Sequence, residues 1–229
     1  MNIGIVIPAY NVGDRLQDVL SKSLTYISKD RIYVVDDGST DSTGDVATAM
    51  GVILFRHQKN RGKGEALKSG FRSAIKDGLD GIITLDGDGQ HEPAYIPRFI
   101  SLLETTDCDV VLGVRHFRIG DMPFDRICSN RISSLIVSVI AGKWIPDSQC
   151  GYRLIRTAVI ENLHFASSHY ELESELLIKA AKKGCTFSFC PIPVHYEGAG
   201  SHIHRFRDTQ RFCRMVVRLL KDRTMHTKY

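Results

Sequence analysis

A run of polar side chains directly follows the apolar stretch Gly81–Leu85 and contains Asp86, Asp88 and Gln90. A short apolar run with β-branched residues indicates a buried strand, and open α/β sheets bind ligands at the carboxyl ends of such strands. Two neighbouring carboxylates and an amide oxygen are suitable ligands for Mg²⁺ or Mn²⁺. We therefore expect a metal site in which the cation bridges a diphosphate. A solvated Asp-Gly turn is the alternative interpretation of the motif alone.

Two other predicted strands also end in groups that could bind a ligand. Tyr10 follows the first strand, and Asp36 and Asp37 follow the second. The carboxylates can accept hydrogen bonds from a ribose hydroxyl or a base N–H group, and Tyr10 can pack on a nucleoside. Adjacent acids repel each other without a ligand or a donor, so a function is expected for both. Asp41 and Ser42, which follow, are interpreted as helix caps.

A glycine-containing segment, Asn60–Ala66, follows the third predicted strand. Its glycines permit close approach of the backbone, and Lys63 places a positive charge near a helix N-terminus, where anions bind. The spacing of a P-loop is absent. By itself the segment indicates an anion-binding turn and no particular ligand.

The elements that must position these groups alternate between strands and helices in the first half of the chain. This alternation predicts an α/β fold with a mostly parallel central sheet covered on both faces. The predicted strands are Ile3–Ala9, Arg31–Val35, Val52–Arg56, Gly81–Leu85 and Asp109–Gly113. The predicted helices are Asp14–Ser28, Ser42–Met50, Gly64–Lys76 and Pro93–Leu103.

The second half of the chain is less regular. It contains no internal repeat and no low-complexity linker, so we expect one domain over residues 1–229. Residues 1–113 would form a nucleotide half, and residues 114–229 an acceptor half with a basic C-terminal helix. The predicted elements are the helices Asp125–Ile140, Glu171–Lys183 and Phe206–Arg223 and the strands Tyr152–Ile155 and Thr186–His195.

Composition excludes several classes of protein. A hydrophobic fraction of 43% and a charged fraction of 24% are ordinary for a soluble globular domain. No apolar run of about 18 residues is present, so no transmembrane helix is predicted. The N-terminal segment is interpreted as a first strand and not as a signal peptide. The six cysteines lack CxxC pairs and zinc-type spacing, which favours reduced thiols in a cytoplasmic protein.

Charge is distributed unevenly along the chain. Residues 1–110 carry 12 basic and 16 acidic side chains, whereas residues 111–229 carry 18 basic and 10 acidic ones. A basic second half could meet an anionic membrane, a nucleic acid or a phosphorylated acceptor. No recognised nucleic-acid-binding motif accompanies it, so no nucleic acid partner is expected. A non-catalytic protein that binds anionic lipid or nucleic acid is the remote alternative to an enzyme.

Seven stretches of this sequence occur in the order and spacing of one known family. The chain resembles the family 2 glycosyltransferases of the GT-A fold, and among them the branch that transfers sugars to polyprenyl and dolichol phosphates. The resemblance covers nearly the entire chain. The stretches are PAYN, VVDDGSTD, NRGKGEALKSGF, LDGDGQHEP, GVRHF, PDSQCGYRL and PIPVHYEGAGSHIHRFRDT.

The resemblance implies a Rossmann-like three-layer sandwich and an inverting transfer from a UDP- or GDP-linked sugar, with Mg²⁺ or Mn²⁺ as cofactor. Asp86, Asp88 and Gln90 would hold the metal and the diphosphate, with Asp88 counted among the catalytic residues. The cation would neutralise the charge that develops on the leaving nucleoside diphosphate. The residues expected to bind the donor are Pro8, Ala9, Tyr10, Asn11, Asp36, Asp37, Lys63, Gly64, Asp86, Gly87, Asp147 and Arg153.

Arginines expected on the acceptor side follow the fifth predicted strand. By the resemblance, Arg115 and Arg126 would clamp the acceptor phosphate, a task that suits the planar guanidinium fork. A surface ion pair is the alternative for both. Asp147 and Arg153 match a family motif beside the sugar pocket, and a buried ion pair that fixes their loop is the alternative interpretation.

The need for a catalytic base depends on the acceptor. A lipid phosphate is already an anion and could attack the sugar directly, whereas a hydroxyl acceptor needs a positioned carboxylate. Glu173 is the candidate base, because relatives that glycosylate hydroxyls place an aspartate at this position. Glu171 and Glu175 compete with it, and acids in a first helical turn often interact only with the helix dipole.

Two departures from the lipid-phosphate branch leave the acceptor open between a lipid phosphate and a glycan or lipid hydroxyl. Members of that branch often carry an arginine in the Pro-Ile segment before Gly-x-Ser, but Glu197 stands near that place here. Many members also carry transmembrane helices, and none is predicted in this chain.

Contact with a membrane surface could come from either of two apolar segments. These are residues 132–144 and the basic helix over residues 206–223, whose composition is typical of interfacial helices. Docking of the terminal helix on the core, with solvated arginines, is the alternative. We expect a cytoplasmic protein that is peripheral on the inner face of the membrane. The sequence does not indicate the nucleotide base, the sugar or the oligomeric state.

Overall fold

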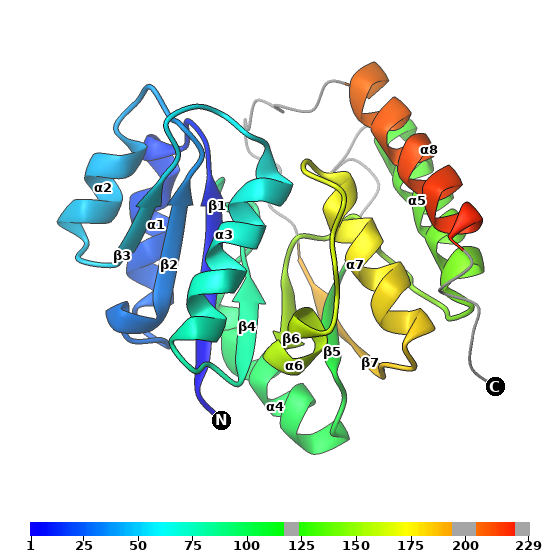
Figure 1. Cartoon of the computed structure of the whole chain (residues 1–229). Coiled ribbons are helices and arrows are strands. Elements are labelled where there is room, and N and C mark those ends of the chain that lie inside the picture. The colour runs from blue at the N-terminus through cyan, green and yellow to red at the C-terminus, as the bar shows by residue number, and fades with distance from the viewer. Residues whose placement is uncertain (117–123, 194–204, 223–229) are drawn as a thin grey trace.

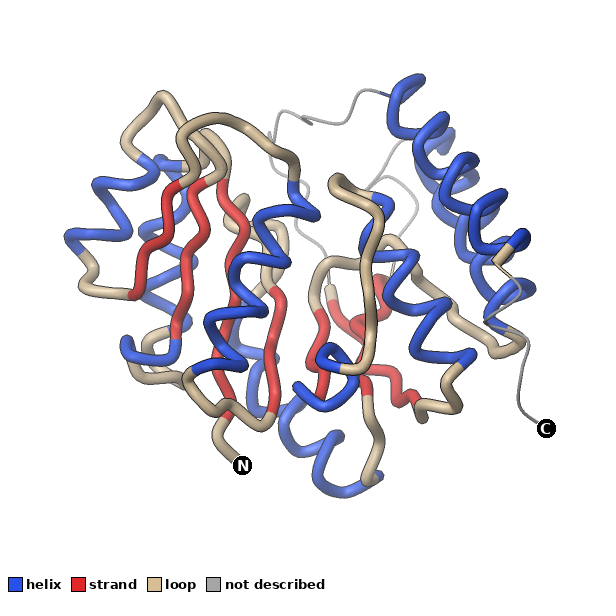
Figure 2. The backbone as a smooth tube through the Cα atoms, viewed as in Figure 1, coloured by secondary structure: helices blue, strands red, loops and turns tan. Residues whose placement is uncertain are grey.

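Within the described part of the chain, seven strands form one sheet with helices on both faces (Figures 1 and 2). The structure is a computed structural model and describes residues 1–116, 124–193 and 205–222. The strand order is β3-β2-β1-β4-β6-β5-β7. The strands are β1 (Ile3–Ala9), β2 (Ile32–Asp36), β3 (Ile53–Arg56), β4 (Gly81–Thr84), β5 (Val110–Arg115), β6 (Arg153–Arg156) and β7 (Phe187–Ile192).

All strand pairs are parallel except the two that β6 makes. β6 lies antiparallel between β4 and β5, with Ile155 opposite Ile82 and Leu154 opposite Val111. The strands β1, β2 and β4 are buried almost throughout, as expected for a sheet covered on both faces. The prediction of a mostly parallel central sheet is therefore confirmed. Because β6 and β7 belong to the second half of the chain, both halves contribute to one sheet.

Helices cover the two faces of the sheet as separate layers. One face carries α1, α2 and α4, and the other carries α3, α6 and α7 (Figure 1). The helices α5 and α8 pack outside this sandwich, against α7. The helices are α1 (Gly13–Ser23), α2 (Thr43–Ala49), α3 (Lys63–Lys76), α4 (Ile96–Thr106), α5 (Phe124–Ala141), α6 (Thr157–Glu161), α7 (Glu171–Lys182) and α8 (Arg205–Lys221), with short 3₁₀ turns at Lys29–Arg31 and Pro93–Tyr95.

Several predicted boundaries differ from the observed ones. The first helix ends at Ser23 and not at Ser28, because residues 24–28 form turns that place Ile27 in the core. The fourth predicted helix begins as a 3₁₀ turn at Pro93 before α4. The short helix α6 was not predicted, and the ends of the strand and helix predicted to reach His195 and Arg223 lie outside the described residues.

The direction of the strands decides where the site forms. β1, β2, β3 and β4 are parallel, so their carboxyl ends meet along one edge of the sheet. The segments predicted to bind the donor follow these strands. In Figure 1 this edge lies at the top, and α3, α7 and α8 all begin on this upper side of the molecule.

Candidate active site

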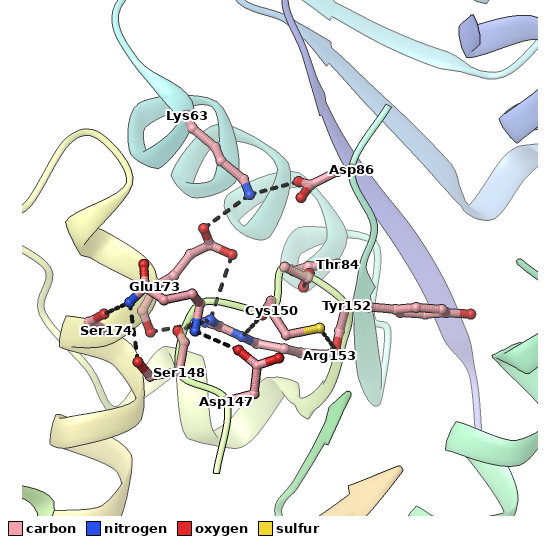
Figure 3. Close-up of polar contacts among 12 residues, drawn as sticks. Lys63, Thr84, Asp86, Asp147, Ser148, Cys150, Tyr152, Arg153, Glu173 and Ser174 are labelled. Atoms are coloured by element: carbon pink, nitrogen blue, oxygen red, sulfur yellow. Dashed lines mark hydrogen bonds and ion pairs between the residues drawn. The ribbon is translucent and has the colours of Figure 1, made fainter. Parts of the chain in front are cut away.

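Three charged side chains from distant parts of the chain meet at the carboxyl edge of the sheet (Figure 3). The Nζ atom of Lys63 lies 2.7 Å from Asp86 Oδ1 and 3.0 Å from Glu173 Oε2. Lys63 begins α3, Asp86 follows β4, and Glu173 lies in the first turn of α7. The structure thus brings two residues predicted to bind the donor next to the residue predicted as a base.

The lysine at the centre of this cluster is held as a cation. Burial acts to lower the pKa of Lys63, but the charges of Asp86 and Glu173 outweigh burial and raise this pKa above its ordinary value. An ammonium group between two carboxylates is therefore a fixed positive charge. It lies where the start of a helix already favours anions.

A buried arginine fixes Glu173 from the other side. The guanidinium of Arg153 donates hydrogen bonds to the backbone carbonyls of Ser148, Cys150 and Glu173 at 2.9 to 3.0 Å, and its Nη2 atom lies 3.7 Å from Glu173 Oε1. A fully buried cation requires such acceptors. Arg153 therefore ties the loop before β6 to the start of α7, as in the loop-fixing interpretation of this residue.

Gly151, which the sequence analysis did not select, lets the backbone approach the ion pair. A Cβ atom at this position would lie 2.5 Å from Asp86 Oδ2 and 3.0 Å from Lys63 Nζ. The Thr84 hydroxyl donates to the Gly151 carbonyl at 2.7 Å and fixes this approach. The available signal was the place of Gly151 between two candidate residues, Asp147 and Arg153.

The second carboxylate of the predicted metal motif is destabilised as an anion. Burial and the neighbouring charge of Asp86 raise the pKa of Asp88. For Asp86 itself, burial acts to raise the pKa, but Lys63 outweighs burial and lowers it. The backbone N–H of Gln90 donates to Asp88 Oδ1 at 3.0 Å and so orients this carboxylate. Gly87 is buried between the two acids.

The carboxylates of Asp86 and Asp88 fit a divalent cation that also binds oxygen atoms of a ligand. In the described residues, no group of three or more His, Cys, Asp and Glu side chains could hold a metal ion. Mg²⁺ is commonly held by one or two carboxylates together with phosphate oxygens of the substrate. Asp86 and Asp88 could supply the carboxylates of such a site, where a cation would relieve the repulsion between their charges.

The acid pair at the end of β2, Asp36 and Asp37, accepts hydrogen bonds from other groups of the protein. Asp36 is fully buried and accepts hydrogen bonds from Arg56 Nε at 2.7 Å and from the Ser39 backbone at 2.8 Å. Asp37 accepts from the His57 ring at 2.6 Å. It also accepts from the backbone N–H groups of residues 61 and 62 at 2.7 to 3.1 Å. Direct contact of these two acids with a nucleoside stays a prediction.

Asp37 acts on the segment that carries Lys63. Its bonds to residues 61 and 62 fix the turn immediately before α3. His57, a second residue that sequence analysis missed, links Asp37 to the Ser69 hydroxyl, which lies 3.0 Å from the ring Nε2. These contacts set where Lys63 starts the helix.

The segment after β1 is tied to the loop after β2. Ala9 is buried, and its carbonyl accepts from the Asp37 backbone at 2.8 Å. Asn11 adopts a positive φ of 51°, and its Oδ1 atom accepts from the Thr40 backbone at 2.9 Å. Pro8 and Tyr10 are half-buried at the same edge.

The cap predicted at Asp41 and Ser42 is correct for the first residue only. Asp41 accepts from the backbone N–H groups of Thr43 and Gly13, the first residues of α2 and α1, at 3.0 Å each. The Ser42 side chain makes no capping hydrogen bond. The prediction for Ser42 was wrong, and with a φ of −74° and a ψ of 5° its backbone lacks the extended conformation that is typical of a capping residue.

Arg115 forms a two-pronged pair with Asp147. Its Nε and Nη2 atoms lie 2.7 and 2.8 Å from the two carboxylate oxygens. Both side chains are nearly buried. The structure therefore agrees with the alternative interpretation of Arg115 as part of an ion pair, although this pair is less exposed than the surface pair that the sequence suggested. Arg126 lies in the first turn of α5, and its side chain is outside the described residues. A phosphate clamp at these arginines stays a prediction.

A further segment that the sequence analysis did not select, residues 166–170, packs over the start of α3. The Ser168 carbonyl accepts from the Glu65 backbone at 3.0 Å, and a Cβ atom on Gly64 would lie 2.6 Å from the Ser168 carbonyl carbon. The Tyr170 ring centre lies 5.8 Å from Lys63 Nζ, a distance at which a cation interacts with an aromatic face. Only the tertiary contact with α3 makes this segment part of the site.

A competing acid, Glu175, faces away from the cluster. Its fully buried carboxylate accepts from the Ser167 backbone at 2.8 Å and pairs with Lys179 at 2.7 Å and Arg218 at 3.1 Å. Glu171 accepts weakly from the Ser168 backbone at 3.3 Å. Of the three acids considered as the base, Glu173 alone contacts Lys63 among the described residues.

Comparison with known proteins identifies the family. The model of the family described as Glycosyl transferase family 2 matches residues 4–164. The chain belongs to glycosyltransferase family 2. This glycosyltransferase is therefore an enzyme, and the alternative of a non-catalytic binding protein is wrong.

Named relatives of the glycosyltransferase act on lipid phosphates. It is 34% identical to an uncharacterized protein of Methanocaldococcus jannaschii, over 83% of this chain and 87% of that one. It is 29% identical to the UDP-N-acetylglucosamine–dolichyl-phosphate N-acetylglucosaminyltransferase of Methanococcus voltae, over 85% and 86% of the two chains. It is 28% identical to the undecaprenyl-phosphate mannosyltransferase of Micrococcus luteus, over 84% and 83%. The resemblance to the polyprenyl-phosphate branch is confirmed.

Solved structures confirm the GT-A fold. The glucosyl-3-phosphoglycerate synthase of Mycobacterium tuberculosis, in complex with Mn²⁺, UDP-glucose and phosphoglyceric acid, superposes with a TM-score of 0.74. The match is 20% identical in sequence and covers all of this chain and 81% of that one. Among the described helices of the glycosyltransferase, none is both long and apolar enough to cross a bilayer.

Proposed function

We propose that this glycosyltransferase moves a sugar from a nucleoside-diphosphate sugar to a polyprenyl phosphate or a related lipid phosphate, with inversion and with Mg²⁺ or Mn²⁺ bound. The named relatives support a lipid phosphate as the acceptor. The observation that carries the proposal is the state of Glu173: one carboxylate oxygen contacts Lys63 and the other faces Arg153. A carboxylate held between two cations is poorly placed to take a proton, and a phosphate acceptor requires no base.

On the donor side, Asp86, Asp88 and Gln90 are proposed to hold the cation and the diphosphate. When bound, the cation would offset the negative charge that develops on the leaving nucleoside diphosphate. Lys63 adds a second fixed positive charge next to Asp86. The negative charge on the departing nucleoside diphosphate would thus be offset without proton transfer, which is electrostatic stabilisation of a developing charge.

The nucleoside is proposed to lie over the ends of β1 and β2. Tyr10 offers a ring to the base, and Asp37 fixes the turn that presents Lys63. A uridine donor is supported by the relative and the structural neighbour named for UDP-linked sugars. A guanosine donor remains part of the proposal as the alternative.

On the acceptor side, Arg115 and Arg126 are proposed to attract the lipid phosphate to the second half of the molecule. A phosphate oxygen would then attack the anomeric carbon from the face opposite the leaving group, which inverts the configuration. Because the proposed acceptor is a lipid, we propose that the enzyme works at a membrane surface.

A hydroxyl acceptor is the second candidate. Its supporting observation is that Glu173 lies beside Lys63 and Asp86, where a general base would be needed. Under this alternative Glu173 would release Lys63 before it takes the hydroxyl proton.

Direct transfer assays test the acceptor. The purified enzyme with Mn²⁺ is incubated with radiolabelled UDP-N-acetylglucosamine, UDP-glucose or GDP-mannose, and with either undecaprenyl phosphate or undecaprenol. We expect a lipid-extractable product that releases its sugar in mild acid, from the phosphate acceptor only. Transfer to undecaprenol, with the phosphate inactive, would contradict the proposal.

A substitution separates the two acceptors independently of lipid handling. For a phosphate acceptor, Glu173→Gln should lower kcat by no more than about tenfold, because no proton must be removed. Loss of a general base would lower kcat by roughly 10²- to 10⁴-fold. Glu171→Gln is the matched control, since it changes a neighbouring acid that does not contact Lys63.

A further inference from the structure

Lys63 places a positive charge against the acids that are proposed to bind the metal ion. Its ammonium lies 2.7 Å from Asp86 Oδ1 (Figure 3). Lys63 also favours the anionic form of Asp88, although burial and the charge of Asp86 oppose this more strongly. The ammonium therefore compensates part of the negative charge that a divalent cation would compensate.

Asp86 is the residue for which the ammonium and a divalent cation would compete. The ammonium contacts Oδ1, and the backbone of Gly151 lies against Oδ2, since a Cβ atom on Gly151 would be 2.5 Å from this oxygen. Two cations on one carboxylate repel each other, and the repulsion is strong in the interior because it is screened less than in water. A divalent cation at Asp86 therefore favours release of this carboxylate by Lys63.

Glu173 is a second partner for Lys63 and is itself held in place. Its Oε2 atom lies 3.0 Å from the ammonium. The guanidinium of Arg153 lies 3.7 Å from Oε1 and donates to the Glu173 backbone carbonyl at 2.9 Å. The Glu173 side chain is 8% exposed, whereas that of Asp86 is 25% exposed. Of the two carboxylates, Asp86 is thus the one that a ligand reaches more easily.

The start of α7 surrounds a position to which the ammonium can move. Glu173 lies in the first turn of α7, and Tyr170 directly precedes this helix. The ring centre of Tyr170 lies 5.8 Å from Lys63 Nζ, within the range of a cation–π contact. Because lysine carries its charge on a flexible stem, the ammonium can leave Asp86 without movement of the backbone.

We infer that Lys63 is a displaceable substitute for the divalent cation at Asp86, and that Glu173 retains the ammonium when Asp86 binds a metal ion. Lys63 stays protonated, so the exchange moves a charge and no proton. The inference rests on the proposed function for the binding of a metal ion at Asp86. It makes Glu173 a positioning residue that acts through Lys63, a role that does not depend on proton removal.

This exchange would link the binding of the metal ion to that of the nucleotide. Lys63 is expected to bind the donor, and a diphosphate would compensate the charge of the ammonium once it leaves Asp86. Without a nucleotide, a metal ion must compete with Lys63 and gains no such compensation. Metal binding to the nucleotide-free protein should therefore be weakened by Lys63.

NMR spectroscopy of the lysine side chains follows the exchange in the wild-type protein. The lysines are labelled with ¹⁵N, and Lys63→Arg assigns the Lys63 signal by its loss. We expect addition of Mg²⁺ to the UDP-bound protein to move this signal toward its position in Asp86→Asn, in which the ammonium has lost one charged partner. The signal of Lys179, which pairs with Glu175 at 2.7 Å, should stay in place. A Lys63 signal that does not move when Mg²⁺ saturates the protein would overturn the inference.

The affinity of the nucleotide-free protein for Mn²⁺ gives an independent readout. It is measured from the electron paramagnetic resonance of free Mn²⁺. Lys63→Met removes the competing ammonium and should raise the affinity by at least about tenfold. Glu173→Gln removes the retaining carboxylate and should lower the affinity by about fivefold. Glu171→Gln is the matched control and should leave the affinity within about twofold of wild type. If Lys63→Met does not fold, the NMR titration still decides.

A double variant distinguishes displacement from a simple sum of charges. If Lys63 and Glu173 acted only through their separate fields, Glu173→Gln would lower the Mn²⁺ affinity by the same factor with and without Lys63. Displacement makes the two substitutions non-additive, so Glu173→Gln should change the affinity of Lys63→Met by less than about twofold. Equal factors in the two backgrounds would overturn the inference.

Transfer assays separate this inference from the proposed function. If the Lys63 signal moves as expected and no sugar reaches undecaprenyl phosphate, the inference stands and the proposed acceptor is wrong. If transfer to undecaprenyl phosphate occurs and the signal does not move, the proposed function stands and the inference is overturned. Failure of Mn²⁺ to bind even with a nucleotide would overturn both the inference and the proposed metal site.

Discussion

The ends of β2 and β4 each carry two acids, and the two ends differ in what contacts the carboxylates. At the end of β2, Asp37 accepts from a histidine ring and two backbone N–H groups at 2.6 to 3.1 Å. At the end of β4, Asp86 contacts the side chain of Lys63, and Asp88 accepts from one backbone N–H group and lies within reach of a like charge. The first pair is satisfied by the protein, and the second is left in an arrangement that a cation would stabilise.

This difference teaches how to separate structural acids from ligand-binding acids when the sequence shows both. Carboxylates that fix a turn are surrounded by donors from that turn, so they add stability. Asp88, which faces the charge of Asp86 and accepts from one backbone N–H group, is less well stabilised as an anion. Perturbed charge at a site is therefore evidence of function when the geometry agrees.

Removal of the charge at Asp88 should have the largest effect. Asp88→Asn is expected to lower kcat for sugar transfer by about 10²- to 10³-fold, as for loss of one electrostatic stabiliser. The melting temperature should not fall, since the substitution removes a like-charge contact with Asp86. Steady-state kinetics and thermal unfolding on one preparation check both parts. An Asp88→Asn variant that is destabilised but fully active would show that Asp88 has a structural role and no role in the reaction.

Removal of the charge at Asp37 should mainly lower stability, whereas removal of the charge at Asp88 should mainly lower activity. Asp37→Asn leaves three donors facing an amide, so the free energy of unfolding should fall by about 2–4 kcal/mol. Urea unfolding measures this loss. Asp45→Asn, on the exposed face of α2, is the control, and it should lower the unfolding free energy by no more than about 1 kcal/mol through loss of a first-turn acid. An Asp37→Asn variant as stable as wild type would show that the turn does not depend on this carboxylate.

Metal binding offers a third, smaller test. Because Asp86 and Asp88 supply few ligands alone, UDP or GDP should increase the affinity for Mn²⁺ by at least about tenfold. By linkage, Mn²⁺ must increase the affinity for the nucleotide by the same factor. Calorimetric titrations in both orders measure the factor. Strong Mn²⁺ binding without nucleotide would point to a site built from protein ligands alone.

The smallest expected effect is the pH dependence of the unfolding free energy that Glu175 contributes. Like Asp37, Glu175 accepts backbone hydrogen bonds. Burial acts to raise the pKa of Glu175, but hydrogen bonds from Lys179, Ser167 and the backbone outweigh burial and lower it below the ordinary 4.5. A lowered folded-state pKa gives a stabilising contribution that is complete above about pH 4.5 and lost as the pH falls through the folded-state value.

Unfolding measurements across acid pH test this contribution. The difference in unfolding free energy between wild type and Glu175→Gln should be constant near neutral pH and shrink below about pH 4.5. Lys76→Gln, a surface change on α3, should leave the pH profile unchanged. A difference that stays constant down to pH 3 would show that the Glu175 contacts do not depend on its charge.

Much of the fold could be predicted from local pattern. The strands β1, β2 and β4 are short apolar runs bounded by turn residues, and α3 and α7 follow helical periodicity. Boundaries were less certain because a helix end such as Ser23 depends on how Ile27 reaches the core. The antiparallel direction of β6 has no signal in its own residues, since pairing on both sides buries a strand equally in either direction.

The candidate site, like the fold, could be predicted from the sequence only in part. Residue types and spacing singled out Lys63, Asp86 and Asp88, because each carries chemistry that is visible in the sequence, and the family resemblance singled out Glu173. The shared ion pairs of Lys63 were not predictable, because its partners lie on elements far apart along the chain. Gly151 escaped notice for the same reason, since its role is to allow close approach of another element.

By itself, the sequence determined the order of strands and helices, the acids at the strand ends and the family. These follow from periodicity and local spacing, which act over a few residues. Only the tertiary structure decided which acids are satisfied by the protein, that Arg115 pairs with Asp147, and that α5 leaves Leu135 and Val139 exposed. Those outcomes depend on which elements pack together, and burial and charge pairing are properties of that packing.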